Sequence, residues 1–240
     1  MTDVITDERV AELERRVAEL ETFASEISHD LKAPLAGICG YAQLLAHLDV
    51  GWPRPAEFDE FLGEIQRGTE RMSRLIDDVL SFSTARDEPV RPATVDLAAL
   101  VDAVVAELPR DPSRPSPSIT RDELPPVQGD HVMVRRLLDN LIGNAIKYVR
   151  PGEVARVHVS GRAGDGMVRV EVTDRGVGIP DGQHEAIFAE LHRAHPDAYS
   201  GTGLGLTICR RIVHRLGGVI HADPHFREGA RIWFTLPAAP

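Results

Sequence analysis

The chain has little cysteine, since Cys39 and Cys209 are the only 2 in 240 residues. Neither is accompanied by a second Cys or by a His at the spacing that metal ligands need. The sequence therefore predicts neither a disulfide framework nor a zinc site, and we interpret both thiols as reduced and buried.

Long apolar runs are also lacking. The longest uncharged stretch, residues 33–48, has 16 residues and includes Pro34, Gly37 and Gly40, whereas a membrane span needs about 20 mostly apolar residues. The N-terminus runs directly into Asp7 and Glu8 without the basic start and apolar middle of a secretion signal. We expect a cytoplasmic protein with no direct membrane insertion.

Positive charge is the third deficit. The chain has 27 basic and 37 acidic residues and a formal net charge of −10. A protein that follows nucleic-acid phosphates needs the opposite sign, so we expect no nucleic-acid partner. An apolar fraction of 42% is enough for buried cores, and the length allows one large domain or two modest ones.

The N-terminal segment carries a heptad repeat. Arg9 and Arg16 fall at g positions, where they face Glu14 and Glu21 at the e positions of a parallel partner. This predicts an N-terminal coiled coil over residues 1–22 and a parallel homodimer; the alternative is one amphipathic helix that packs on its own chain. The apolar seam consists of Val10, Leu13, Val17, Leu20, Ala24, Ile27 and Leu31.

The sequence pattern of residues 23–88 predicts a helical hairpin. The helical pattern continues past Pro34 to Leu45 and breaks at residues 51–55, which hold two prolines and a glycine. A second apolar stripe at helical spacing runs from Phe58 to Phe82. Two long helices with a tight connection form an antiparallel pair, and a second copy could cover their apolar stripes in a dimeric four-helix bundle.

The sequence pattern of residues 89–240 predicts an α/β sandwich. With the helical hairpin before it, the whole chain is expected to be an α+β multidomain protein. A linker holds Pro89 and Pro92, and a Pro-rich loop spans residues 109–126. Alternating valines on both sides of a Gly-Asp-Gly turn predict one β-hairpin, and residues 219–222 with 231–236 predict another. Helices are expected over residues 97–108, 132–149 and 204–216.

Three patterns carry chemistry. His29 falls on the solvent side of the heptad helix, and the next residue, Asp30, could accept a proton from one ring nitrogen and leave the other free to attack. Asn140 and Asn144 share one helix face; an amide oxygen suits Mg²⁺, and Lys147 one turn later can reach a phosphate. Each pattern alone is weak evidence, because lone surface histidines and polar helix faces are common.

Two glycine-rich segments form the third pattern. Asp174 follows a predicted strand and precedes Gly176 and Gly178, which permit close backbone approach to a ligand, and its carboxylate could accept a hydrogen bond from an adenine amino group. Downstream, a glycine-rich run opens a helix whose unpaired N–H groups favour phosphate. That run consists of Gly201, Thr202, Gly203, Leu204, Gly205 and Leu206.

Together these segments resemble two-component sensor histidine kinases, and in particular the bacteriophytochrome-like subgroup. The phosphoacceptor box (residues 28–35), the N box (residues 138–148) and the two glycine boxes follow one another in the family order, and the resemblance covers residues 23–236. It implies a phosphoacceptor hairpin over residues 23–88 and a Bergerat-type ATP-binding domain over residues 89–240.

The resemblance also implies an activity: ATP-dependent autophosphorylation of His29 with Asp30 as general base, then transfer to an Asp of a response regulator receiver domain. The predicted cofactors are ATP and Mg²⁺. Asn144 would hold Mg²⁺, Asn140 would lie near the transferred phosphoryl group, and Arg193 would stabilise the γ-phosphate. The nucleotide would contact Lys147, Tyr148, Asp174, Gly176, Gly178, Gly201, Thr202, Gly203, Leu204 and Gly205.

Some residues depart from the family pattern. Leu191 replaces a usual aromatic. Few residues separate Arg193 from Gly201, so we expect a short lid. The alternative role of Arg193 is that of a solvated surface charge. Ala33 cannot orient water, which puts phosphatase activity in doubt. Asn140 stands where gyrase-type ATPases have a Glu that activates water, which argues against an ATP-hydrolysing clamp. The main alternative is a dimeric nucleotide-binding scaffold without phosphotransfer.

Overall fold

The computed structural model describes residues 31–32, 34–45, 56–84, 90–108, 115–196, 198–199 and 202–240. The chain divides into two compact units, Met1–Glu88 and Pro89–Pro240. The predicted coiled coil, the His29–Asp30 pair, Ala33 and Gly201 lie outside the described residues.

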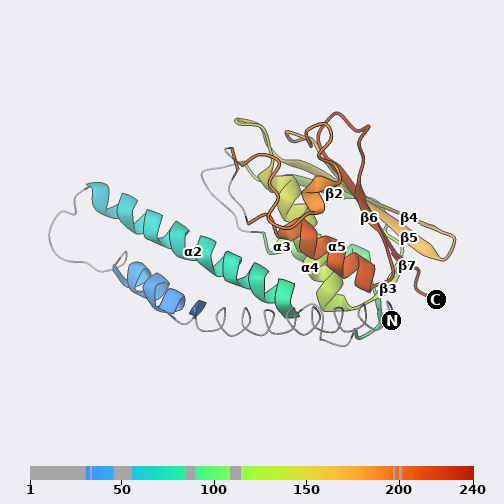
Figure 1. Cartoon of the computed structure of the whole chain (residues 1–240), viewed down its shortest axis with the longest axis horizontal. Helices are drawn as coiled ribbons and strands as arrows, with labels where there is room; N and C mark the ends of the chain where they lie inside the picture. Colours follow the sequence, from blue (N-terminus) through green and yellow to red (C-terminus); the bar gives the residue numbers. More distant parts are fainter. Residues whose placement is uncertain are drawn as a thin grey trace, which may run out of the picture. The chain divides into compact units, whose positions relative to one another are not determined.

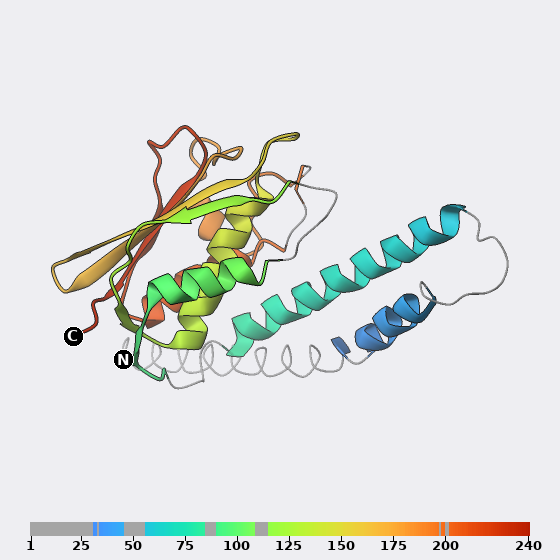
Figure 2. The same cartoon turned by 180° about the vertical axis from the view of Figure 1, so that it is seen from behind.

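The described residues of the first unit form two helices. Residues 34–45 form one continuous helix that includes Pro34. The helix α2 spans Ala56–Thr84, where the second helix of the hairpin was predicted. Figures 1 and 2 show the two helices side by side and running in opposite directions. Buried side chains on both helices, Leu35 and Ala42 on one and Leu62 and Ile76 on the other, account for their pairing.

A second apolar stripe of this unit stays exposed. On α2, Phe61 is 64% exposed, Ile65 45% and Met72 49%. These positions lie four and seven residues apart and so share one helix face. The first helix adds further exposed apolar side chains, which are Ile38, Tyr41, Leu44 and Leu45.

The second unit is an α/β sandwich, as predicted. One five-stranded sheet has the order β2-β4-β5-β7-β6, and β1 and β3 form a separate antiparallel pair. Figures 1 and 2 show the helices covering one face of the large sheet. The strands are β1 (Ala93–Val95), β2 (Ser118–Arg121), β3 (Val127–Gly129), β4 (Arg156–Gly164), β5 (Met167–Asp174), β6 (Ile220–Ala222) and β7 (Arg231–Pro237); the helices are α3 (Leu97–Ala106), α4 (His131–Lys147), the short 3-10 helix η1 (Ala186–Phe188) and α5 (Gly205–Arg215).

The core of this unit forms where α4 and α5 pack on the alternating valines of the sheet. In α4, Leu137, Leu138 and Ile142 are fully buried, and every second residue of β5 from Val168 to Val172 faces inward. Asp130 caps α4, because its Oδ1 accepts hydrogen bonds from the amides of Val132 and Met133 at 2.9 and 3.2 Å. This cap and core fix the helix that carries both asparagines of the N box.

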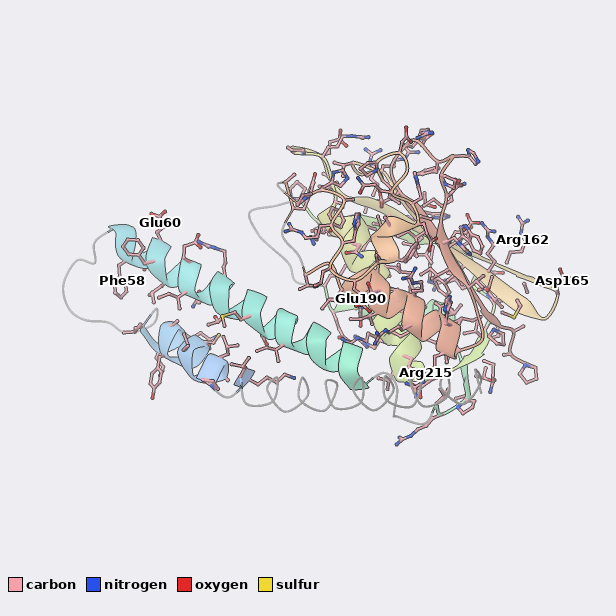
Figure 3. The ribbon with its side chains drawn as sticks, in the orientation of Figure 1. Phe58, Glu60, Arg162, Asp165, Glu190 and Arg215 are labelled. Carbon is pink, nitrogen blue, oxygen red and sulfur yellow. The ribbon has the colours of Figure 1, made fainter. Side chains whose placement is uncertain are left out.

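The β4–β5 hairpin agrees with its predicted turn. Gly164 pairs with Met167, so Asp165 and Gly166 form a two-residue turn with φ of 51° and 73°, as hairpin turns with two left-handed residues require. Asp165 lies at the tip of the hairpin (Figure 3). No helix in the described part of the chain combines the length and the apolar character of a membrane span.

Two expectations were wrong. The predicted loop over residues 109–126 contains β2, which pairs in parallel with β4, Ser118 opposite Arg156. A four-residue strand whose side chains are mostly exposed has no hydrophobic alternation from which it could be recognised. Of the two cysteines, Cys209 is buried as expected, but Cys39 is only half-buried.

Candidate nucleotide-binding site

A cavity in the second unit brings together residues from segments that are far apart in the sequence. The predicted binding residues Asn144, Tyr148, Asp174, Gly178 and Arg193 all line it. Its apolar walls include Leu141, Val172, Ile187, Leu206 and Ile232. A few polar groups that converge in an apolar cavity are typical of a small-molecule site.

Asp174 is the polar residue at the end of β5. It is only 8% exposed, and its Oδ1 accepts hydrogen bonds from the backbone amides of Gly176 at 2.8 Å and Ala230 at 3.0 Å. No residue in the described ranges donates to Oδ2, so this oxygen of a cavity-lining carboxylate remains available to a ligand donor. Burial raises the pKa of Asp174, although the two amide donors act in the opposite direction.

Glycines hold the backbone close around this carboxylate. A Cβ on Gly176 would lie 2.0 Å from the Tyr148 carbonyl oxygen, and one on Gly229 would lie 2.1 Å from the Asp174 carbonyl oxygen. Gly176 was predicted, but Gly229 was not, because a single Gly before a strand carries no signature of a site. Both positions therefore exclude every residue with a side chain unless the backbone moves.

The N box lies on α4 and at its C-terminal end. Asn144 lines the cavity, and no hydrogen bond of its side chain is found within the described residues. Lys147 Nζ lies 3.3 Å from the Tyr148 hydroxyl and 4.7 Å from the centre of the Tyr148 ring. The Asn140 amide donates to the Arg136 carbonyl at 3.0 Å, one turn back along α4. Asn144 is thus the amide of this helix that is available to a ligand in the cavity.

The second glycine box starts α5. Gly203 has φ of 77°, and a Cβ there would lie 2.6 Å from the carbonyl carbon of Leu191. The amide of Leu204, the residue before α5, donates to Thr202 Oγ1 at 3.2 Å. The helix itself begins at Gly205 without a side-chain cap, and a Cβ on Gly205 would lie 2.9 Å from Asn140 Oδ1. The N box and the second glycine box therefore touch, as a shared site requires.

Residues 191–196, 198 and 199, which we call the lid residues, supply part of the cavity lining. Among them, His192, Arg193 and His195 line it. The Arg193 guanidinium donates through Nη2 to the carbonyls of Pro196, at 2.7 Å, and of Tyr199. Neither histidine nor Tyr199 was predicted as a binding residue, because the family resemblance implies a phosphate contact for Arg193 alone among the lid residues, and the other side chains reach the site only through the path of the backbone.

The residues present suit a magnesium ion that arrives with a nucleotide. The described residues contain no cluster of three or more His, Cys, Asp or Glu side chains that could hold a metal by themselves. Asn144 offers one hard oxygen in the cavity, and Mg²⁺ commonly combines few protein oxygens with phosphate oxygens and water. The donor set therefore fits Mg²⁺ and does not resemble a closed protein cage.

Comparison with known proteins agrees with this geometry. Residues 19–88 match the His Kinase A (phospho-acceptor) domain, and residues 129–240 match the domain described as histidine kinase-, DNA gyrase B- and HSP90-like ATPase. The chain is 34% identical over 227 residues to cyanobacterial phytochrome A of Nostoc sp. strain PCC 7120, covering 94% of this chain and 29% of that protein. It is 33% identical over 266 residues to the sensor histidine kinase AruS of Pseudomonas aeruginosa, covering 99% of this chain and 26% of that protein.

Solved structures give the same result. Full-length ShkA in complex with AMPPNP matches with a TM-score of 0.73 and 27% identity, over 91% of this chain and 46% of ShkA. The mycobacterial sensor histidine kinase MprB matches with a TM-score of 0.53 and 29% identity, over 62% of this chain and 99% of the MprB structure.

A helical phospho-acceptor region followed by an ATPase fold defines the class, and the chain belongs to the two-component sensor histidine kinases. It spans less than a third of the length of the two curated relatives.

Proposed function

We propose that the chain binds Mg-ATP in the cavity of its second unit, transfers the γ-phosphoryl group to His29, and passes it on to an Asp of a response regulator receiver domain. The match of the phospho-acceptor domain includes His29, and a structural relative, ShkA, is known in complex with AMPPNP. The observation that carries the proposal is Asp174: one carboxylate oxygen is held by two backbone amides, and the other remains for a ligand amino group such as that of adenine.

The proposed transfer uses the chain's own residues as follows. One ring nitrogen of His29 attacks the γ-phosphorus, the bond from this phosphorus to the β,γ-bridging oxygen breaks, and ADP leaves with that oxygen. Asp30 accepts the proton of the other ring nitrogen. Lys147, Arg193 and the start of α5 would orient the triphosphate and compensate its charge. Held by Asn144, Mg²⁺ would neutralise phosphate charge.

The base of the nucleotide would enter the apolar part of the cavity. Val172 and Ile232, which pair across β5 and β7, line the cavity together with Asp174, and an apolar wall removes water from the hydrogen bond between Asp174 and the base. A hydrogen bond to a charged group contributes about 1.5–3 kcal/mol. We propose that this hydrogen bond orients adenine and that the phosphates then extend toward Asn144.

We further propose that the chain acts as a cytoplasmic homodimer. The exposed apolar stripe of α2, with Phe61, Ile65 and Met72, supports a bundle of two hairpins. The coiled coil predicted over residues 1–22 would align the two chains in parallel.

Labelling with γ-³²P-ATP tests the proposal. Wild type is expected to acquire an acid-labile, alkali-stable label, as a phosphorylated histidine does, and His29→Gln is expected to acquire none. His221→Gln, a change at a histidine of β6 that stacks on Trp233 away from the cavity, serves as the control. A purified receiver domain added afterwards should remove the label from the kinase. Equal labelling of wild type and His29→Gln would disprove the kinase proposal.

The alternative scaffold gives a different result in the same assay. Leu191 is 69% exposed and has φ of 59°, so the aromatic that the family pattern places here is replaced by a solvent-facing Leu. If the lid of this chain does not support transfer, ATP binds, Asp174→Asn weakens the binding, and His29 stays unlabelled. Steady phosphate release that is independent of His29 would instead indicate a hydrolysing clamp.

A further inference from the structure

Tyr199 forms hydrogen bonds through both its side-chain hydroxyl and its backbone carbonyl. Its hydroxyl donates to the Val149 carbonyl at 2.8 Å, across fifty residues of sequence, and its own carbonyl accepts a hydrogen bond from Arg193. The Tyr199 ring lies 5.1 Å from the ring of Tyr148. One residue therefore connects the lid residues to the backbone that follows α4.

A second contact ties the lid residues to another part of the cavity. His195 Nε2 donates to the Gly178 carbonyl at 3.0 Å, and Gly178 belongs to the loop that follows Asp174. The His195 ring also lies 6.0 Å from the ring of Tyr199 and 6.3 Å from that of Tyr148. The two hydrogen bonds thus attach the same short segment to Gly178, which lines the cavity, and to Val149, which follows the cavity-lining Tyr148.

Arg193 is held inside this arrangement. Its Nη2 donates to the carbonyls of Pro196 and Tyr199, so its hydrogen-bonding capacity is partly used within the lid residues. The donors on Nε and Nη1 take no part in these two bonds, so Arg193 can donate to a phosphate while it keeps both contacts. Because Tyr199 carries one of the two acceptors, its position, together with that of Pro196, determines where the Arg193 guanidinium lies.

From these contacts we propose that Tyr199 is a positioning residue that latches the nucleotide cavity. With its hydroxyl bound to Val149 it keeps the lid residues against the cavity, slows the escape of nucleotide, and holds Arg193 ready beside the phosphates. His195 forms the second half of the latch through Gly178. This inference rests on the proposed function, since it requires that a nucleotide occupies the cavity.

The latch predicts a specific change in nucleotide release. Tyr199→Phe removes only the hydroxyl and keeps the ring that lies beside Tyr148. One neutral hydrogen bond contributes about 0.5–1.5 kcal/mol, so the dissociation rate of a fluorescent ATP analogue such as mant-ATP should rise about twofold to tenfold. His195→Ala should also raise it, and the double variant should exceed either single one. The control is Tyr41→Phe, a change at an exposed tyrosine of the first unit.

Stopped-flow displacement of mant-ATP from the full chain measures these rates, and labelling at varied ATP concentration provides a second readout. A latch affects KM more than the labelling rate at saturating ATP, whereas general loss of structure lowers both and also lowers the unfolding midpoint. If Tyr199→Phe releases mant-ATP at the rate of wild type and of Tyr41→Phe, the latch is overturned while nucleotide binding stands. If wild type and Asp174→Asn both fail to bind mant-ATP, the proposed function fails, and the latch fails with it.

Discussion

Asp174 and Ala230 exchange two hydrogen bonds. The Asp174 amide donates to the Ala230 carbonyl at 2.9 Å, and the Ala230 amide donates to Asp174 Oδ1 at 3.0 Å. The first bond is part of the pairing between the ends of β5 and β7, and the second fixes the carboxylate. The residue that is proposed to read the base is therefore aligned by the sheet itself.

Asp174→Asn is expected to weaken ATP binding about tenfold to a hundredfold. The Asn Oδ1 can still accept from Gly176 and Ala230, but the charged oxygen that faces the cavity is lost, and a hydrogen bond to a charged group contributes about 1.5–3 kcal/mol. Isothermal titration with ATP measures the effect. Asp102→Asn, a change at an exposed carboxylate that pairs with Arg121, is the matched control. Equal affinities of wild type and Asp174→Asn would contradict the assignment.

The same substitution should have the opposite effect on stability. Burial raises the pKa of Asp174 above its ordinary value of 3.8. A carboxyl group with a raised pKa in the folded protein binds its proton more tightly there than in the unfolded chain. Its contribution to stability is therefore fully present below the ordinary pKa and is lost as the pH rises through the raised one. At a pH above the raised pKa the folded protein has to hold an ionised carboxylate in a buried position.

Without nucleotide, Asp174→Asn is thus expected to be more stable than wild type at pH 7, and the difference should shrink as the pH falls toward 4. Urea unfolding at a series of pH values measures it. A stability difference that stays constant over this range, or that grows toward acid pH, would show that burial does not dominate the carboxylate's energetics. Loss of binding together with a gain in stability would mark Asp174 as a functional rather than a structural residue.

Two glycines of the second unit are expected to respond to alanine with opposite signs. In Gly176→Ala the new Cβ would lie 2.0 Å from the Tyr148 carbonyl oxygen, and backbone atoms cannot yield cheaply, so we expect a loss of about 1–3 kcal/mol. In Gly143→Ala the Cβ meets nothing within 4 Å and lies inside α4, so we expect a gain of about 0.5–1 kcal/mol. Urea unfolding compares both with wild type, and similar effects at the two positions would refute the described packing.

Asn144→Ala should remove much of the benefit of magnesium. Loss of even an outer partner of a metal site costs about 10–100-fold in metal affinity, so loss of the oxygen ligand itself should weaken Mg-ATP binding at least about tenfold. ATP affinity measured with Mg²⁺ and with EDTA gives the comparison, since the variant should differ from wild type mainly when Mg²⁺ is present. Gln128→Ala in β3 is the control. An equal loss with and without Mg²⁺ would indicate that Asn144 contacts the nucleotide rather than the metal.

How much the sequence predicts depends on the kind of signal. The helices α2 and α4 and the β4–β5 hairpin follow from periodic apolar residues and from the Asp165-Gly166 turn. The strand β2 is missed, because four mostly exposed residues have no periodicity and gain their place only by pairing with β4. Long-range pairing of this kind is decided by tertiary structure.

The residues of the site can also be separated into those that the sequence predicts and those that it does not. Asn144 and Asp174 belong to motifs, and they line the cavity. The family resemblance implies no role for Tyr199 or His195, and their bonds to the carbonyls of Val149 and Gly178 depend on backbone atoms that every residue possesses. Side-chain motifs therefore predict the groups that meet the ligand, whereas the groups that hold the backbone around it become visible only in three dimensions.

The exposed stripe of the first unit leads to the last prediction. Ile65 is 45% exposed on α2, on the same face as Phe61 and Met72. If a second hairpin covers this face, Ile65→Glu replaces a buried apolar contact by a charge. Burial of one such side chain contributes about 1.5–3 kcal/mol, so the dimer should dissociate at least about tenfold more readily.

Sedimentation velocity over a range of micromolar concentrations follows this equilibrium. Glu60→Gln, at an exposed position on α2 that points away from the first helix (Figure 3), changes charge without touching the stripe and should leave the equilibrium unaltered. If Ile65→Glu sediments as wild type does, the dimer interface lies elsewhere. If Ile65→Glu becomes monomeric but is still labelled on His29, each chain phosphorylates its own histidine. Label that disappears together with the dimer would instead indicate transfer between the two chains.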